Sequence, residues 1–130
     1  MTQKELSQLY WLNREIEADK IRLAELEAAA TGETSKITGL PHAPGISNKT
    51  AIAAEIADVR TVIKAKSEMA VVEYNRLNRY IARVEDSLIR QIMSLRYVDG
   101  LSWRQVAYCI GGGNTEDGVR VAVSRYLRTH

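Results

Sequence analysis

Apolar residues recur every three to four positions over most of the chain, and this spacing predicts helices throughout. The first such stretch, residues 3–30, carries an apolar seam that only Asp19 interrupts. Seams of this spacing are typical of a coiled coil or of a helical hairpin, and the Glu, Lys, Arg and Gln between them form the solvated face. We therefore expect one long helix that packs on another. The seam consists of Leu9, Leu12, Ile16, Leu23, Leu26 and Ala30.

A loop separates this stretch from a second long helix. Residues 31–47 contain three glycines and both prolines of the chain, which end a helix. The loop is long for a helix–helix connection, which favours a mobile connector over a binding element. Ser47 or Asn48 is expected to cap a helix from about Lys49 to Arg83. Its seam holds Ile52, Ile56, Val59, Ile63, Ala70, Leu77 and Val84.

Neither long helix can bury its apolar stripe alone. The simplest solution is an antiparallel pair, formed within one chain or between two chains. A hairpin closed within one chain still leaves helix surface to cover, so we expect a homodimer.

A shorter amphipathic helix is expected to follow over residues 87–97. Asp86 is a suitable N-cap for it, and Leu88, Ile92 and Leu95 share one face. The dipeptide at 99–100, Asp-Gly, is expected to end the helix.

The last 30 residues predict a helix, a glycine turn and a final helix. Ser102 caps a helix over 103–110, residues 111–114 form the Gly-Gly-Gly-Asn turn, and Thr115 caps a helix from Glu116 to about Arg128. This is the plan of a helix-turn-helix DNA reader. In that plan Val106, Ala107 and Ile110 pack on Val119, Val123 and Tyr126 or Leu127.

The face of the final helix opposite its packing residues carries side chains suited to DNA. An arginine in the second turn of such a helix can reach guanine O6 and N7, or a phosphate. Arg104 and Gln105, at the start of the preceding helix, are placed for contacts to the DNA backbone. The outward face holds Asp117, Arg120, Val121, Ser124 and Arg128.

Charge adds modest support for a polyanionic partner. The chain carries 18 basic and 16 acidic side chains, a net charge of +2, but its last eleven residues hold Arg120, Arg125 and Arg128 with no acidic residue. A basic terminus on a neutral body favours binding to nucleic acid.

Catalytic and metal sites find little support in the residue inventory. Cys109 is expected to be a buried structural thiol, since it sits in a helix beside core residues with no histidine nearby. His42 and His130 are far apart in sequence, and with one cysteine they make no metal site. We therefore expect no enzyme activity, no catalytic residue and no cofactor.

The same inventory bears on the compartment. A single cysteine excludes a disulfide framework and favours a reducing interior. No apolar run approaches the roughly 20 residues that span a bilayer, and the N-terminus is unlike a signal peptide. We expect a cytoplasmic protein without a membrane partner.

The stretch from Leu88 to Ala107, LIRQIMSLRYVDGLSWRQVA, resembles region 4 of bacterial sigma factors. The chain is more closely similar to small sigma-like proteins of phages and prophages of Gram-positive bacteria, among them the ArpU and RinA types of late transcription regulator. Those proteins share a Trp-Leu-x-x-Glu-Ile stretch, here residues 11–16, and a Thr-x-x-Pro-His loop, here residues 38–42.

This resemblance implies roles for individual residues and partners. Arg96, Tyr97 and Trp103 would be structural, with Trp103 anchoring the short helix, and Gly118 stands where relatives are expected to carry a side chain. The implied partners are double-stranded DNA and host RNA polymerase, inside a bacterial host cell. With Arg125 added, the candidate DNA-binding residues are Arg104, Gln105, Thr115, Asp117, Arg120, Val121, Ser124, Arg125 and Arg128.

The sequence thus predicts an all-α protein. Residues 1–84 would form a long helical hairpin or coiled-coil arm, followed by a sigma-region-4-like helix-turn-helix domain over 85–130. The leading function is a sequence-specific DNA-binding regulator of phage type, an activator of late genes. Two alternatives stay open: a small terminase-like DNA-packaging protein, and a coiled-coil adaptor that binds RNA polymerase without touching DNA.

Overall fold

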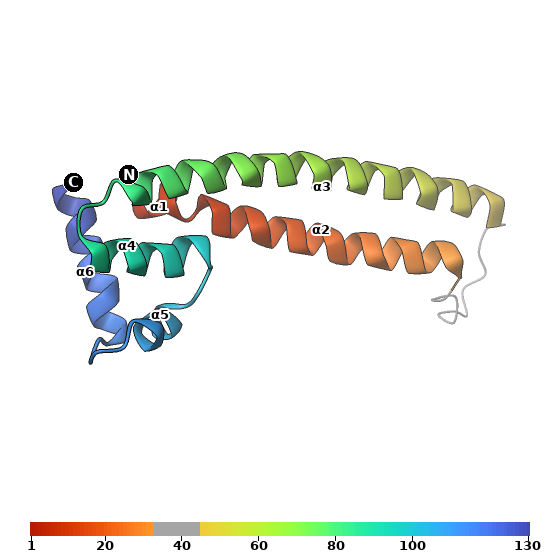
Figure 1. The fold of residues 1–130 in the computed structure, drawn as a ribbon. Coiled ribbons are helices and arrows are strands. Elements are labelled where there is room, and N and C mark those ends of the chain that lie inside the picture. The colour runs from red at the N-terminus through yellow and green to blue at the C-terminus, as the bar shows by residue number, and fades with distance from the viewer. Residues whose placement is uncertain (33–44) are drawn as a thin grey trace. The chain divides into compact units, whose positions relative to one another are not determined.

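The computed structural model describes residues 1–32 and 45–130, with side chains described up to residue 32 and from residue 49 onward. This part of the chain is all-helical and contains no strand, which confirms the predicted all-α class. None of its helices is both long and apolar enough to cross a membrane. The helices are α1 (Gln3–Leu6), α2 (Gln8–Thr31), α3 (Gly45–Ala82), α4 (Ser87–Met93), the π-helical turn Ser94–Val98, α5 (Trp103–Ile110) and α6 (Glu116–Thr129) (Figure 1).

The start of α3 differs from the expectation. The helix begins at Gly45, so Ser47 and Asn48 lie inside it and neither is its N-cap. Ser47 and Asn48 were expected as caps because they directly precede the apolar seam. The helix, however, begins before its first seam residue. Residues 33–44, which hold His42 and most of the expected loop 31–47, lie outside the described residues.

Contacts divide the chain into two units. The first joins Met1–Asn13 to Ala70–His130, and the second is Arg14–Met69. Because α2 and α3 each contribute residues to both units, the units are described one at a time.

The first unit has one hydrophobic core to which all of its helices contribute. Helix α6 packs on α4 and on α5, and the buried Leu77 and Ile81 at the end of α3, with Val84 just after it, join the same core. Complete burial of side chains of this size contributes about 1.5 to 3 kcal/mol each. The other buried core residues are Leu6, Leu9, Ile89, Ile92, Met93, Tyr97, Val106, Ala107, Val119 and Val123.

Helix α4 begins at the predicted cap but buries a different face. The Asp86 carboxylate accepts hydrogen bonds from the backbone N–H groups of Leu88 and Ile89, at 2.8 and 3.3 Å. Ile92 is fully buried, whereas Leu88 is 42% exposed, so the face that these two residues were expected to share is buried only in part. The buried face of α4 consists instead of Ile89, Ile92 and Met93, because the rest of the core packs on that side of the helix.

Three residues to which the sigma-factor resemblance assigns a structural role contact one another in and after the segment that follows α4. The Arg96 guanidinium lies 4.7 Å from the centre of the Trp103 ring and donates a hydrogen bond to the Leu101 carbonyl at 2.9 Å. The Tyr97 ring meets Trp103 edge-on, with centroids 6.2 Å apart. Burial raises the pKa of the Tyr97 hydroxyl to about 12, against an opposing effect of the Arg96 charge. Trp103 is itself partly buried against the core.

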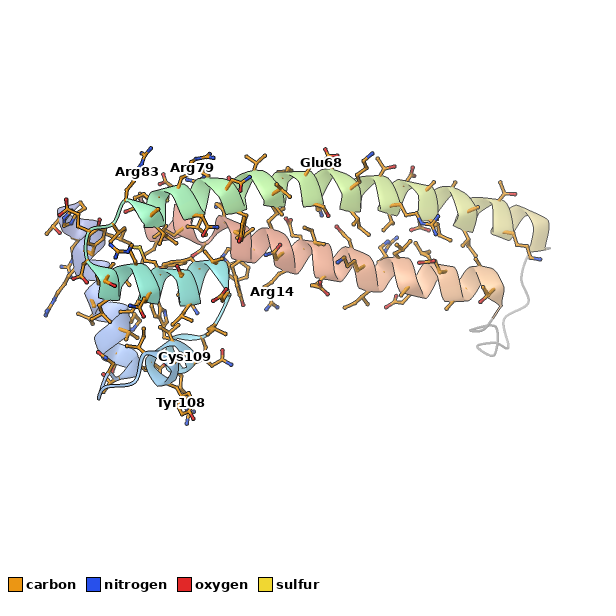
Figure 2. All side chains as sticks on the ribbon, in the orientation of Figure 1. Arg14, Glu68, Arg79, Arg83, Tyr108 and Cys109 are labelled. Carbon is orange, nitrogen blue, oxygen red and sulfur yellow. The ribbon has the colours of Figure 1, made fainter. Side chains whose placement is uncertain are left out.

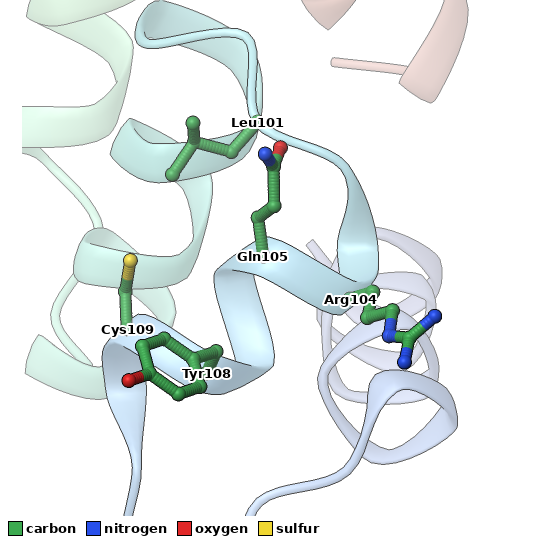
Figure 3. A pocket seen from close by; sticks show the side chains of 5 residues that line it. All are labelled: Leu101, Arg104, Gln105, Tyr108 and Cys109. Atoms are coloured by element: carbon green, nitrogen blue, oxygen red, sulfur yellow. The ribbon is translucent and has the colours of Figure 1, made fainter.

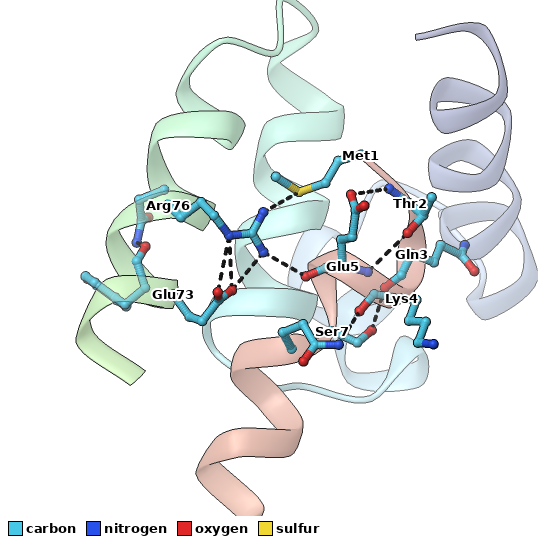
Figure 4. A network of polar contacts seen from close by, with 11 residues as sticks. Met1, Thr2, Gln3, Lys4, Glu5, Ser7, Glu73 and Arg76 are labelled. Carbon is cyan, nitrogen blue, oxygen red and sulfur yellow. Dashed lines mark hydrogen bonds and ion pairs between the residues drawn. The ribbon is translucent and has the colours of Figure 1, made fainter. Parts of the chain in front are cut away.

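A polar network ties α1 to α3 within the first unit (Figure 4). The Arg76 guanidinium pairs with the Glu73 carboxylate at 2.7 Å and donates to the Glu5 carbonyl at 3.2 Å. Thr2 caps α1: its hydroxyl accepts from the Glu5 N–H, and the Glu5 carboxylate accepts from the Thr2 N–H. The N-terminal turn is therefore held in a defined place on the core.

The second unit consists of residues 14–31 of α2 and 45–69 of α3, which lie side by side (Figure 1). Asp19, the polar residue that interrupts the first seam, has a partner on the other helix. Its carboxylate accepts a hydrogen bond from Lys66 Nζ at 2.8 Å. This hydrogen bond raises the pKa of Lys66. Two further ion pairs join the helices, Arg22 with Glu55 and Glu27 with Arg60.

The apolar seam of the second unit is incompletely covered. Ile16 is the only buried residue among the described side chains of this unit, at 7% exposure. The remaining apolar seam residues that point between the two helices are partly buried: Leu23, Leu26, Ile52, Ile56, Val59 and Ile63. Two helices alone therefore leave part of the seam open to solvent.

Candidate nucleic-acid interface

Helix α5 starts at a reciprocal cap. The Ser102 hydroxyl accepts from the Gln105 N–H at 3.1 Å, and the Gln105 side-chain oxygen accepts from the Ser102 N–H at 2.9 Å. This capping box satisfies N–H groups at the start of the helix, and Val106 and Ala107 lie on its buried side, where α5 packs on α6. Gln105, predicted as a DNA contact, is exposed but has its side-chain oxygen engaged in the cap.

The turn between α5 and α6 depends on glycine. Gly111, Gly112 and Gly113 all adopt positive φ, at 67°, 63° and 82°. Residues other than glycine rarely adopt positive φ, because this backbone conformation costs them roughly 1–2 kcal/mol each. The Asn114 backbone N–H and side-chain amide both donate to the Gly111 carbonyl, at 3.1 and 2.8 Å, and close the turn.

Helix α6 is amphipathic, with its buried face toward α5 and α4. Val119 and Val123 are 1% and 0% exposed. The opposite face carries Asp117 and Arg120, both exposed and joined by an ion pair of 2.9 Å, while Val121, which follows Arg120, is partly buried. The predicted candidates near the start of α6 thus lie together on its outward face.

The second half of this face is partly occupied by the N-terminal segment. The Gln3 side-chain amide donates to the Ser124 hydroxyl at 3.1 Å. A pocket of about 380 Å³ lies beside this contact, lined by Met1, Thr2, Gln3, Ser124, Leu127 and Arg128. Ser124, predicted as a DNA contact, is already hydrogen-bonded, whereas the predicted arginines Arg125 and Arg128 are exposed. The outward face of α6 is therefore open mainly along its first half.

The outer face of α5 carries a surface that sequence reasoning missed (Figures 2 and 3). Tyr108 is 88% exposed and follows Arg104 by four residues, so both lie on one edge of the helix. The spacing of four residues between Arg104 and Tyr108 was the signal in the sequence that could have revealed this surface. Around them is a shallow pocket of about 430 Å³, lined by Leu101, Arg104, Gln105, Tyr108 and Cys109.

Cys109 is exposed, so the prediction of a buried thiol is wrong. The buried positions of α5 are Val106 and Ala107, and Cys109 lies on the opposite side of the helix from Ala107. Proximity in sequence to core residues was therefore a poor guide to its burial.

Thr115 caps α6 rather than projecting freely from it. Its hydroxyl accepts from the Gly118 N–H at 3.0 Å. A Cβ added at Gly118 would lie 2.9 Å from that same hydroxyl oxygen, closer than such atoms approach in proteins. Glycine at 118 is thus explained by the cap, although it lies inside a helix.

We expect Gly118→Ala to give no net stabilisation while Thr115 is present. Replacing an interior helical glycine with alanine ordinarily gains about 1 kcal/mol, but here the clash with the cap offsets the gain. In a Thr115→Ala background, which itself loses about 1 kcal/mol of capping, the same change should stabilise. Urea unfolding of the four proteins in this double-mutant cycle measures the coupling, and equal effects in both backgrounds would contradict it.

Comparison of the chain with protein-family models, with curated proteins and with solved structures finds no match. The function of the chain is therefore inferred from the geometry of α5, the glycine turn and α6.

Proposed function

We propose that α5, the glycine turn and α6 form a helix-turn-helix that binds double-stranded DNA, with α6 as the reading helix. In this proposal the second unit, residues 14–31 of α2 and 45–69 of α3, serves as an arm that joins copies or contacts polymerase, whereas residues 1–13 and 70–84 belong to the helix-turn-helix unit. The chain acts as a sequence-specific transcription regulator of phage type, an activator of late genes.

The observation that carries the proposal is the distribution of side chains on α6. Val119 and Val123 are buried, while Arg120 and Asp117 project to solvent from the first two turns. In helix-turn-helix readers the N-terminal residues of the second helix contact base edges in the major groove. The open first half of α6 is the part that such a docking uses.

Each exposed side chain has a distinct task in this arrangement. Arg120 can donate two hydrogen bonds to guanine O6 and N7, and Asp117 holds its guanidinium in place while the site is empty. Arg104, Arg125 and Arg128 contact phosphates, which set the position of the helix without reading sequence. Gln105 and Thr115 support the surface through the caps that they form.

Selection of bound fragments from sheared host and prophage DNA by the purified protein tests the proposal. Enrichment of one intergenic site upstream of lysis, packaging or structural genes is the expected result. Enrichment at a packaging-start site would replace the regulator with a packaging protein. Failure to bind any duplex at low salt would contradict DNA binding and make RNA polymerase the next bait.

A further inference from the structure

Asp117 is an acidic side chain on the surface assigned to DNA. It lies in the first turn of α6, on the outward face that it shares with Arg120, and its side chain is 83% exposed. A carboxylate at this place is repelled by the phosphates of any duplex that α6 approaches. Its presence favours binding only where the duplex offers it a hydrogen-bond donor.

Two neighbouring residues already stabilise the first turn of α6. The Thr115 hydroxyl caps the helix by accepting from the Gly118 N–H at 3.0 Å. Glu116, also exposed, places a carboxylate at the positive end of the helix dipole. The ion pair of Asp117 with Arg120 is exposed and contributes little to stability. Local stability therefore depends little on Asp117.

The ion pair with Arg120 uses only part of each side chain. Arg120 Nη2 donates to Asp117 Oδ1 at 2.9 Å. The second carboxylate oxygen, Oδ2, has no hydrogen bond or ion pair with any described residue. A guanidinium carries five N–H groups, so Arg120 keeps the two that a bidentate contact to guanine takes. Both side chains can thus contact bases while they remain paired.

We propose, resting on the DNA-reading function proposed for α6, that Asp117 reads a cytosine in the base pair next to the guanine read by Arg120. The three-residue step between them corresponds to about 4.5 Å along the helix axis. Neighbouring base pairs are stacked about 3.4 Å apart, so two side chains at this spacing reach adjacent pairs. Asp117 Oδ2 accepts from the cytosine N4 amino group.

The edges of the bases in the major groove explain the choice of cytosine. A carboxylate only accepts hydrogen bonds, and cytosine presents an N4 donor there. Guanine presents two acceptors and thymine one, and both repel a carboxylate. Adenine has an N6 donor, but its N7 acceptor lies beside it and repels the second carboxylate oxygen. The DNA site therefore contains two adjacent G·C pairs.

Selection from a pool of randomised duplexes tests this assignment. The wild type should enrich a guanine and, in the adjacent pair, a cytosine, each favoured by about tenfold over other bases. Arg120→Ala should remove the guanine preference and so identify that pair. Asp117→Asn should abolish the cytosine preference and favour adenine in its place, because an asparagine amide pairs with adenine N6 and N7.

Glu116→Gln is the matched control. Like Asp117→Asn, it converts an exposed carboxylate of the first turn into an amide and removes one negative charge. Both variants should bind random duplex more tightly than the wild type, since each removes a repulsion from phosphate. Only Asp117→Asn should change the base preference. Urea unfolding of both should match that of the wild type, because the altered side chains are exposed.

Three outcomes would overturn the assignment while leaving DNA reading by α6 in place. The first is a cytosine preference that Asp117→Asn retains. The second is a weaker guanine preference in Asp117→Asn with no change at the adjacent pair, which would make Asp117 a positioning residue for Arg120. The third is a selected site without a cytosine next to the guanine. A wild type that binds no duplex, or binds all duplexes equally, would overturn both the assignment and the proposed function.

Discussion

Replacing both Arg120 and Arg125 with alanine is expected to lower affinity for the selected duplex by about 100-fold at physiological salt. Arg120 projects from the open first half of α6, and a bidentate contact to guanine contributes about 1–3 kcal/mol of discrimination. Arg125, five residues further along the same helix, is the proposed phosphate contact. Removal of each phosphate-binding side chain should also flatten the slope of log K against log salt by about 0.9. Fluorescence anisotropy over a salt series measures both quantities.

The chain offers a charge-matched control for this experiment. Arg79 and Arg83 are exposed on the last turns of α3 and just after them, outside α5 and α6 (Figure 2). Replacing both with alanine removes the same charge and should leave the affinity and the salt slope close to those of the wild type. If the control weakened binding as much as the test variant, the assignment of α6 as the reading helix would be wrong.

Replacing Ile92 with alanine is expected to lower the free energy of unfolding by about 2–5 kcal/mol. Ile92 is fully buried on α4, where α4 meets the rest of the first unit's core. The truncation loses the transfer energy of the side chain and leaves a cavity that the surrounding residues fill only in part. Urea denaturation followed by circular dichroism measures the change.

Leu88→Ala provides the comparison on the same helix. Leu88 is 42% exposed, so the same kind of truncation removes little buried surface and should cost less than about 1 kcal/mol. The pair also tests which face of α4 is buried. If the two variants lost similar amounts of unfolding free energy, Leu88 would have to be buried in the core.

Local signals in the sequence were sufficient for the helix starts that depend on a cap. Asp86, Ser102 and Thr115 each accept backbone hydrogen bonds at the predicted positions, because a short polar side chain satisfies the free N–H groups of a first turn wherever the helix lies. Ser47 and Asn48 failed as caps because α3 had already begun at Gly45. A cap signal is thus reliable only where the chain does not continue as helix before it.

Burial and tertiary partners were predicted less well. Periodicity gives a stripe on a helix, but the side from which neighbours enclose that helix decides which flank of the stripe is covered, as Leu88 and Cys109 show. The contact of Gln3 with Ser124 joins residues 121 positions apart, and neither side chain carries a local pattern that indicates the other. Such contacts depend on the packing of the whole unit.

The exposed thiol of Cys109 gives this protein a built-in attachment point. It is the only cysteine of the chain, so one maleimide dye would react at one place without any substitution. That place is the outer face of α5, beside Tyr108 and Arg104 (Figure 3). A change in the emission of such a dye would report, in real time and at nanomolar protein concentration, when another molecule binds to that face.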